Sequence, residues 1–177
     1  IRTASRRFPA VSLEVYSMEA VEYGELFRAG AEGVTMFQET YDRERYLELH
    51  PTGPKRNFEY RLEAPDRMAQ AGFRQIGMGA LLGLAPWREE VPRLFAHLRR
   101  MEKAYPGVEY SLSFPRIRPV PGDPRVYDAI SDGDLVKVIA IARLLFPRVG
   151  ITLSTRENAE FRDNLLGLGV TRMSAGS

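Results

Sequence analysis

Residues 76–114, IGMGALLGLAPWREEVPRLFAHLRRMEKAYPGVEYSLSF, contain the pattern that decides the fold. The segment opens with the short β-like run Ile76–Leu81 and closes with a second one, Tyr110–Phe114. Between them, Arg88–Tyr105 repeats its apolar residues at the spacing of a helix that lies on a sheet. Two strands joined by one helix are typical of parallel strands with a right-handed crossover.

The same rhythm continues in both directions from this unit. Four further strands are predicted, at Val11–Val15, Val34–Glu39, Ile151–Thr155 and Val170–Ser174. Helices are predicted over Asp66–Ala71 and Asp134–Phe146, and the runs Pro51–Asn57 and Pro119–Pro124 are interpreted as loops that follow strands. No linker interrupts this pattern, so the chain predicts a single α/β domain with a parallel sheet over residues 1–177.

Composition narrows the classes of function that remain. The 177 residues are 44% hydrophobic and 27% charged, which is ordinary for one globular domain. The absence of cysteine excludes a disulfide, a thiolate nucleophile and a cysteine-held zinc or iron–sulfur site within this chain. Two histidines argue against a histidine-rich metal site. The net charge of +2 is spread along the chain, which argues against nucleic acid as a partner.

The sequence also argues against a membrane partner. The longest stretch nearly free of charge, Ile76–Trp87, is far too short to cross a bilayer. No charged region followed by an apolar region opens the chain. We therefore expect a cytoplasmic protein.

The predicted strands alternate between apolar and small polar residues. In Tyr110–Phe114, Ser111 and Ser113 share one face, and in Ile151–Thr155, Thr152 and Ser154 do the same. If the sheet curls into a barrel, this face points into the lumen. A lumen filled by its own side chains needs bulky branched residues, so small polar ones predict room for a ligand.

Polar residues also gather where the strands end, which is where (β/α) barrels carry their active sites. The examples are Glu14, Gln38, Glu39, Thr40, Arg116, Arg118, Ser154, Thr155, Arg156, Glu157, Ser174 and Ser177. Any one of these residues is explained as well by helix capping or by a loop. Repetition at five strand ends favours a binding site.

Eight motifs in order then give a family resemblance over nearly the whole chain. They are Ser12-Leu-Glu-Val15, Phe37-Gln-Glu-Thr-Tyr41, Pro54-Lys55, Pro65-Asp-Arg67, Gly77-Met-Gly-Ala-Leu-Leu-Gly-Leu84, Ser113-Phe-Pro-Arg116, Leu153-Ser-Thr-Arg-Glu157 and Met173-Ser-Ala-Gly-Ser177. The chain resembles the radical S-adenosylmethionine tyrosine lyases of bacterial thiamine biosynthesis, the 2-iminoacetate synthases. Several motifs are shared with the related tyrosine lyases of iron-only hydrogenase maturation.

The resemblance implies a (β/α)8 TIM-type barrel, of which this chain would hold strands three to eight. In the family, a 4Fe-4S cluster cleaves S-adenosylmethionine to a 5′-deoxyadenosyl radical, which takes hydrogen from L-tyrosine. The Cα–Cβ bond then breaks to give 2-iminoacetate and p-cresol. The iminoacetate supplies the thiazole ring, so thiazole synthase of the thiamine pathway is an implied partner.

The chain departs from the family pattern at the cluster. The resembling enzymes hold it with a CxxxCxxC loop after strand one and carry a Gly-Gly-Glu-like segment on strand two, and neither is present here. We therefore expect a partial radical S-adenosylmethionine barrel that lacks the N-terminal cluster-binding portion and is inactive alone. The chain also has Asp42 where the family usually has histidine.

The candidate cofactor-binding residues are Glu39, Gln38, Gly77, Gly79 and Glu14. Glu39 would accept hydrogen bonds from ribose hydroxyls, as the resemblance implies, or cap the following helix. Glu14 would bind an ammonium group or form an ion pair inside the barrel. Gly77 and Gly79 would let adenine approach the backbone, or would only bend a strand.

The candidate substrate-binding residues are Arg156, Ser154, Ser174 and Arg116. Arg156, with the two serines, is the candidate for the tyrosine carboxylate because guanidinium binds carboxylates in a two-pronged fashion. A helix-surface ion pair is the alternative for Arg156, and a structural role is the alternative for Arg116. His97 is predicted on the surface. His50, in a loop before Pro51, would have a structural role or would shape the mouth of the site.

Two other classes of function stay open at this point. A binding or assembly module without chemistry of its own would explain the missing cysteines and would leave open sheet edges for a partner. An unrelated barrel enzyme would use Glu14 and Glu39 as acid and base.

Overall fold

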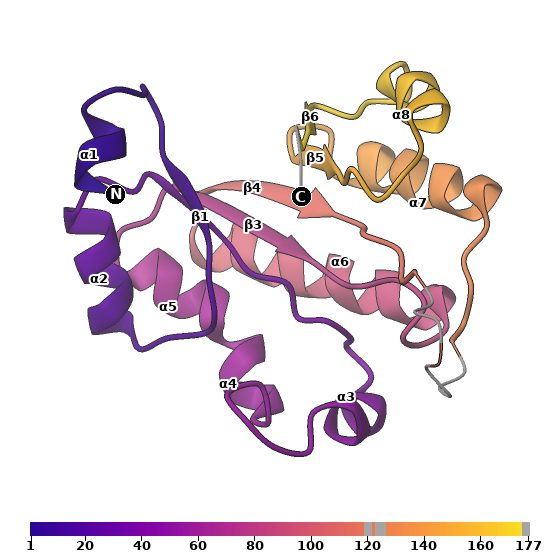
Figure 1. The fold of residues 1–177 in the computed structure, drawn as a ribbon, viewed down its shortest axis with the longest axis horizontal. Helices are drawn as coiled ribbons and strands as arrows, with labels where there is room; N and C mark the ends of the chain where they lie inside the picture. Colours follow the sequence, from indigo (N-terminus) through magenta and orange to yellow (C-terminus); the bar gives the residue numbers. More distant parts are fainter. Residues whose placement is uncertain (119–121, 123–126, 175–177) are drawn as a thin grey trace.

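A computed structural model describes residues 1–118, 122 and 127–174, and its centre is a parallel sheet that curls into a half-barrel (Figure 1). Six strands lie side by side in the order of the sequence. They are β1 (Ser12–Glu14), β2 (Gly33–Thr35), β3 (Gln75–Gly79), β4 (Glu109–Ser113), β5 (Gly150–Leu153) and β6 (Arg172–Met173). The predicted α/β class and the partial barrel are confirmed.

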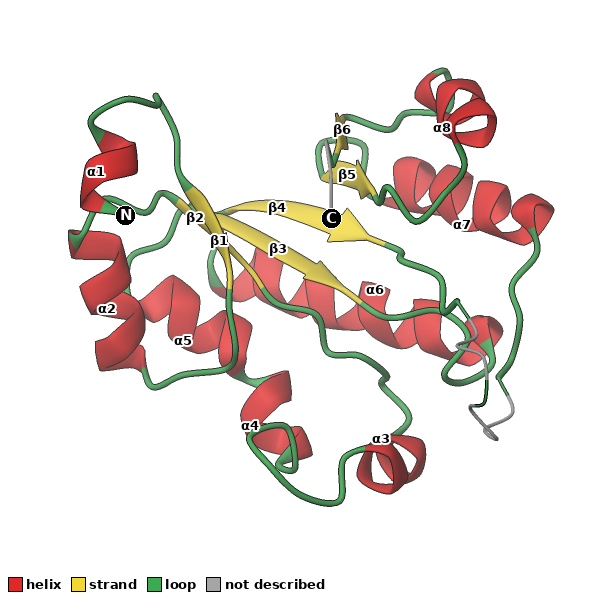
Figure 2. Cartoon of the chain, in the orientation of Figure 1, coloured by secondary structure: helices red, strands yellow, loops and turns green. Residues whose placement is uncertain are grey.

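Helices connect the strands and form the outer layer (Figure 2). They are α1 (Arg2–Ser5), α2 (Ala20–Arg28), α3 (Arg43–Leu49), α4 (Phe58–Leu62), α5 (Ala64–Gln70), α6 (Trp87–Ala104), α7 (Asp132–Leu145) and α8 (Ala159–Leu166). Figure 1 shows α2, α5 and α6 along one face of the sheet, with α7 and α8 beside β5 and β6.

The apolar stripe of α6 accounts for much of the core. Its residues Val91, Leu94, Phe95, Leu98 and Met101 are all buried, as their spacing predicts. They pack in one cluster with the apolar faces of the strands. Fully burying one leucine side chain contributes about 1.5–3 kcal/mol, so this stripe fixes the helix to the sheet.

Two expected boundaries are wrong. The second strand was expected over Val34–Glu39, but β2 ends at Thr35 and the chain turns sharply at Glu39, whose φ is 76°. The loop Pro51–Asn57 does not follow a strand directly, because α3 precedes it and α4 follows it. Most of the loop Pro119–Pro124 and all of residues 175–177, including Ser177 from the polar residues at the strand ends, lie outside the described residues.

The strand register forms two rows of small residues across the inner face. Parallel pairing places Glu14 beside Thr35, Thr35 beside Gly77, and Gly77 beside Ser111. The next row pairs Gly79 with Ser113, and Ser113 with Thr152. These rows occupy positions that bulky side chains fill in a packed barrel, so the lumen stays open.

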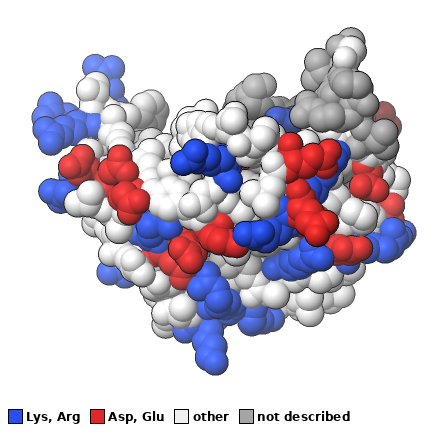
Figure 3. All heavy atoms as spheres, turned by 90° about the horizontal axis from the view of Figure 1, so that it is seen from below, with Lys and Arg blue, Asp and Glu red and all other residues white. Residues whose placement is uncertain are grey.

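The charges on the underside of the molecule are mixed in sign. Figure 3 shows lysine and arginine side chains interspersed with aspartate and glutamate over the described part of this face. Charges that are interspersed in this way do not form a continuous surface of one sign. In the described ranges, moreover, the helices are all too short or too polar to cross a membrane.

Candidate functional site

A cavity of about 540 Å³ opens on the polar face of the sheet. Its lining comes from all six strands or the residues that follow them: Glu14, Thr35, Phe37, Glu39, Lys55, Gly77, Met78, Leu81, Ser111, Ser113, Pro115, Thr152, Ser154, Arg156 and Ser174, the last of these directly after β6. The volume lies within the range of about 300–1,000 Å³ that is usual for small-molecule sites. Six of the nine predicted site residues line this cavity: Glu14, Glu39, Gly77, Ser154, Arg156 and Ser174.

Glu39 enters the cavity between two cations. Lys55 forms an ion pair with its Oε1 atom, and the buried Arg61 donates to the same atom at 3.1 Å. Arg61 is itself fixed by a 2.8 Å bond from its Nε to the carbonyl oxygen of Phe37. Among the described residues no donor bonds Oε2 of Glu39, so this oxygen can accept hydrogen bonds from a ligand.

No sequence pattern indicates a role for Lys55 or Arg61. Lys55 was noted only as part of a motif, and Arg61 lies on the short helix α4. Both residues form ion pairs with Glu39 because the segment 50–62 folds back toward the end of β2. No local sequence pattern predicts this tertiary arrangement. Both therefore belong to the candidate site, although the sequence pattern indicates neither of them.

The opposite side of the cavity carries a cation without a partner. Arg156 lines the cavity, is exposed, and its guanidinium forms no ion pair with the described residues. Ser154 lies two residues earlier, and its hydroxyl accepts from the backbone N–H of Arg156 at 3.2 Å. Ser174 follows β6 and lines the same cavity. The alternative for Arg156, an ion pair with Glu157 or Glu160, does not form among the described residues, and Glu157 binds Arg116 and Arg118 instead.

Glu14 reaches the cavity from β1, at the edge of the sheet. No ion pair joins it to an arginine or a lysine of the described residues, which removes the internal salt bridge as an explanation. Arg156 and Glu14 are therefore groups of opposite charge that line one polar cavity.

Close packing requires both glycines of β3. A Cβ atom at Gly77 would collide with the side chain of Thr35, and one at Gly79 would collide with the backbone oxygen of Ser113 and the ring of Phe37. Gly77 lines the cavity and Gly79 does not. Strand packing is thus sufficient to explain Gly79, whereas Gly77 also borders the ligand space.

The structure does not bring Gln38 into the cavity. Its side chain is buried beside Met36, Met78 and His97 on the other side of the sheet, and both amide atoms lack a partner among the described residues. Gln38 still bonds the backbone of Gly79 as a strand residue would, whereas the chain turns at the next residue, Glu39, which lines the cavity.

Arg116 also lies outside the cavity lining, and its contacts correct the expectation that it binds substrate. Its guanidinium forms a two-pronged ion pair with the buried Glu157. The remaining nitrogen donates to the carbonyl of Ile130 at 3.1 Å and to Asp132 at 2.7 Å. This pair ties the segment after β4 to the segment after β5, directly beside Arg156.

His97 is buried and is not a surface residue as expected. Its Nδ1 atom lies 2.9 Å from the hydroxyl of Tyr41, and its Nε2 atom lies 3.1 Å from Arg100. Arg100 binds Asp66 through two bonds of 2.8 and 2.6 Å. The apolar stripe of α6 is therefore wider than its spacing indicated, because Tyr41 and α5 cover the flank that carries His97.

We expect this burial to make stability depend on pH. Burial, together with the Arg100 cation, lowers the pKa of His97 to about 4, against 6.5 for an ordinary histidine. Between these values the unfolded chain binds a proton that the folded chain does not, so stability is full above pH 6.5 and falls as the pH falls. The loss is about 2 kcal/mol between pH 7.5 and pH 5.

Urea unfolding at the two pH values measures this effect. The variant His97→Gln cannot titrate and should lose about 2 kcal/mol less than the unmutated chain over the same interval. Equal losses in the two proteins would show that His97 does not stay neutral in the folded state.

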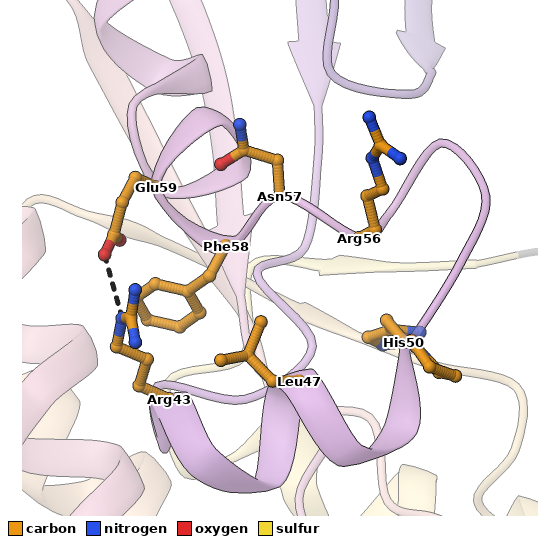
Figure 4. Close-up of a pocket in the computed structure, with 8 residues that line it drawn as sticks. Arg43, Leu47, His50, Arg56, Asn57, Phe58 and Glu59 are labelled. Atoms are coloured by element: carbon orange, nitrogen blue, oxygen red, sulfur yellow. Dashed lines mark hydrogen bonds and ion pairs between the residues drawn. The ribbon is translucent and has the colours of Figure 1, made fainter.

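A second cavity, of about 500 Å³, lies between α3 and α4 (Figure 4). Figure 4 shows Leu47 and Phe58 between the Arg43–Glu59 ion pair on one side and His50 on the other. His50 directly follows α3, with its ring centroid 4.7 Å from that of Tyr46, and does not line the cavity on the sheet. This second cavity contains none of the nine predicted site residues.

The donor set of this chain does not fit a 4Fe-4S cluster. The chain has no cysteine, and the described residues contain no cluster of three or more histidine, aspartate or glutamate residues that could hold a metal ion. Thiolates are the usual ligands of such clusters. Any cluster would have to be held by residues outside this chain.

Comparison with solved structures places the fold in a known class. The chain matches the FeFe-hydrogenase maturase from Carboxydothermus hydrogenoformans with a TM-score of 0.88 and 36% sequence identity, over 94% of this chain and 39% of that one. The half-barrel with its polar inner cavity is part of a TIM barrel of the radical S-adenosylmethionine class. Residues 113–177 match the family model of the Biotin and Thiamin Synthesis associated domain.

Sequence comparison then gives the particular relatives. The chain is 40% identical to 2-iminoacetate synthase of Salmonella typhimurium over 176 residues, and 39% identical to that of Escherichia coli over 172 residues. These alignments cover 99% and 97% of this chain, but 47% and 46% of the two relatives. Over nearly its whole length, the chain is homologous to 2-iminoacetate synthases. It spans about half the length of these curated relatives.

Proposed function

We propose that this chain is the substrate-binding part of a radical S-adenosylmethionine tyrosine lyase of the 2-iminoacetate synthase type. The reaction would cleave the Cα–Cβ bond of L-tyrosine and release 2-iminoacetate and p-cresol. One observation carries the proposal: the cavity gathers polar groups from successive strand ends. The cation Arg156, which has no ion-pair partner in the part of the chain that the structure describes, lies on one side and the carboxylate of Glu39 on the other. The homology over nearly the whole chain supports it.

The two sides of the cavity suit different ligands. Arg156, with the hydroxyls of Ser154 and Ser174, suits the carboxylate of an amino acid. Glu39 suits a ribose diol, because its Oε2 atom is free of donors among the described residues and a carboxylate only accepts. Glu14 suits the ammonium group of either ligand, since it lines the cavity without an ion pair in the described part of the chain.

S-adenosylmethionine fits this side of the barrel, with Glu39 and Gly77 as the residues that would hold its nucleoside part. When bound, it supplies the radical that starts the reaction. The roles of this chain are to bind the nucleoside, to fix the amino-acid carboxylate and to keep the two ligands side by side. The single domain of residues 1–177 would be completed by a cluster-binding portion, and 2-iminoacetate would pass to thiazole synthase.

Binding of L-tyrosine to the isolated chain tests the assignment of Arg156. We expect L-tyrosine to shift the backbone NMR signals of Ser154, Arg156 and Ser174 in a saturable manner. Tyramine has the same ring and amine but no carboxylate, so it should leave these signals unchanged. Equal shifts with both compounds, or none with L-tyrosine, would count against the carboxylate site.

A further inference from the structure

The segment after β2 closes around a buried carboxylate on the outer helix α6. Glu90 is fully buried. Its Oε1 atom accepts from the Thr40 hydroxyl at 2.8 Å and from the backbone N–H groups of Tyr41 and Asp42, each at 3.0 Å. Its Oε2 atom accepts from the same Tyr41 N–H at 2.9 Å. A carboxylate that accepts from three donors of one short segment holds that segment firmly against α6, because hydrogen bonds to a charged group are stronger than those between neutral groups.

The segment that Glu90 binds begins at Thr40, the residue after Glu39. Glu39 has a φ of 76°, the left-handed conformation that side chains other than glycine rarely adopt. Immediately before it, Gln38 N–H donates to Gly79 at 3.0 Å, as in a continuing strand, and the carbonyl oxygen of Glu39 accepts from Leu81 N–H at 2.8 Å. The turn at Glu39 is thus held by β3 on one side and by Glu90 on the other.

A second set of bonds fixes the same segment from outside. The Tyr41 hydroxyl lies 2.9 Å from His97, which also belongs to α6. Thr40 is fully buried, and its hydroxyl oxygen also accepts from Asp42 N–H at 3.0 Å. Residues 40–42 are therefore attached to one rigid helix, which leaves the turn at Glu39 little freedom.

We infer that Glu90 is a positioning residue that holds Glu39 in its left-handed turn and so aims the Glu39 carboxylate at a ligand in the cavity. Among the described residues, Glu90 hydrogen-bonds Thr40, Tyr41 and Asp42, none of which lines the cavity, so it acts through this segment. The ligand class is a nucleoside with a free ribose diol, and this part rests on the proposed function. A strained backbone conformation persists only where its surroundings determine it, and Glu90 supplies that constraint.

The first test measures hydrogen exchange by NMR in the variant Glu90→Gln. An amide side chain has one acceptor atom in place of two and adds donors that face the N–H groups of the segment. We expect the Leu81 amide, which bonds the carbonyl of Glu39, to exchange about tenfold faster or more. The control is Glu89→Gln, the same change on the exposed neighbouring residue. The Leu98 amide in the buried stripe of α6 reports on global opening.

Thr40→Val gives a milder second variant in case Glu90→Gln does not fold. It removes one donor to Glu90 and should accelerate exchange at Leu81 in the same direction by a smaller factor. The inference is wrong if Leu81 exchanges no faster in these variants than in Glu89→Gln. It is also wrong if Leu81 and Leu98 accelerate by the same factor, because the effect is then global destabilisation.

Nucleoside affinity provides the second readout. The unmutated chain should bind adenosine more tightly than 2′,3′-dideoxyadenosine, and Glu90→Gln should reduce this preference about as much as Glu39→Gln does. The double variant should lose no more than Glu39→Gln alone, because Glu90 acts only through Glu39. Additive losses would overturn the inference. If the unmutated chain shows no preference, the proposed role of Glu39 in binding fails, while the exchange measurement still decides whether Glu90 positions it.

Discussion

Replacing Arg116 by alanine should lower the free energy of unfolding by about 3–5 kcal/mol. The guanidinium and the Glu157 carboxylate are both buried, with side-chain exposures of 7% and 1%. Removing the cation leaves the Glu157 charge in a poorly solvated site. It also leaves the carbonyl of Ile130 without its 3.1 Å donor. Arg118 remains 3.1 Å from Glu157, but it is half exposed and cannot replace a two-pronged buried partner.

Urea unfolding of three variants distinguishes a buried pair from simple loss of side-chain volume. Arg118→Ala removes only the exposed contact and should cost less than about 1 kcal/mol. The double variant Arg116→Met with Glu157→Leu removes both charges, and it should recover most of the loss seen in Arg116→Ala. If the double variant is less stable than Arg116→Ala, the stability depends on the packing around these side chains rather than on the unpaired charge.

Replacing Arg156 by alanine should weaken binding of L-tyrosine by about 10- to 100-fold, because one charge-assisted contact to a carboxylate is worth about 1.5–3 kcal/mol. Arg156 has no ion-pair partner among the described residues, so its removal leaves no buried charge behind. We therefore expect the free energy of unfolding to change little, which separates this residue from Arg116.

The matched control is Arg148→Ala. Arg148 is an exposed arginine that precedes β5, whereas Arg156 follows it, so the two lie at opposite ends of the same strand. Titrations of both variants by NMR should show loss of affinity for L-tyrosine in Arg156→Ala alone. Equal affinities in the two variants would remove Arg156 from the site and leave the carboxylate without an assigned partner.

The architecture could be predicted from the sequence because its cause is local. Each strand carries its own alternation and each long helix its own apolar stripe, and parallel order follows from their succession. The inner face could be predicted for the same reason, since Ser111, Ser113 and Thr152 are placed there by period two alone. The turn at Glu39 could not be predicted, because the residues that hold it are distant in the sequence.

The candidate site could be predicted only as a set of strand ends. The positions of the strand ends place Arg116 beside Arg156. They do not show that Arg116 forms an ion pair with Glu157, or that Arg156 has no ion-pair partner among the described residues. Likewise, the spacing of α6 places His97 off the apolar stripe, and only tertiary packing against Tyr41 and α5 buries it. The missed residues Lys55 and Arg61 reach Glu39 from loops and short helices, where neither periodicity nor capping indicates a partner.

The central proposal is tested most directly in a chimeric enzyme. The aligned half of the Salmonella typhimurium 2-iminoacetate synthase would be replaced by this chain, which is 40% identical to it. After anaerobic reconstitution with iron and sulfide, p-cresol would be measured against the S-adenosylmethionine consumed. We predict release of p-cresol from L-tyrosine, strongly reduced by Arg156→Ala and unchanged by Arg148→Ala. A folded chimera that consumes S-adenosylmethionine in the presence of L-tyrosine without releasing p-cresol would contradict the proposal.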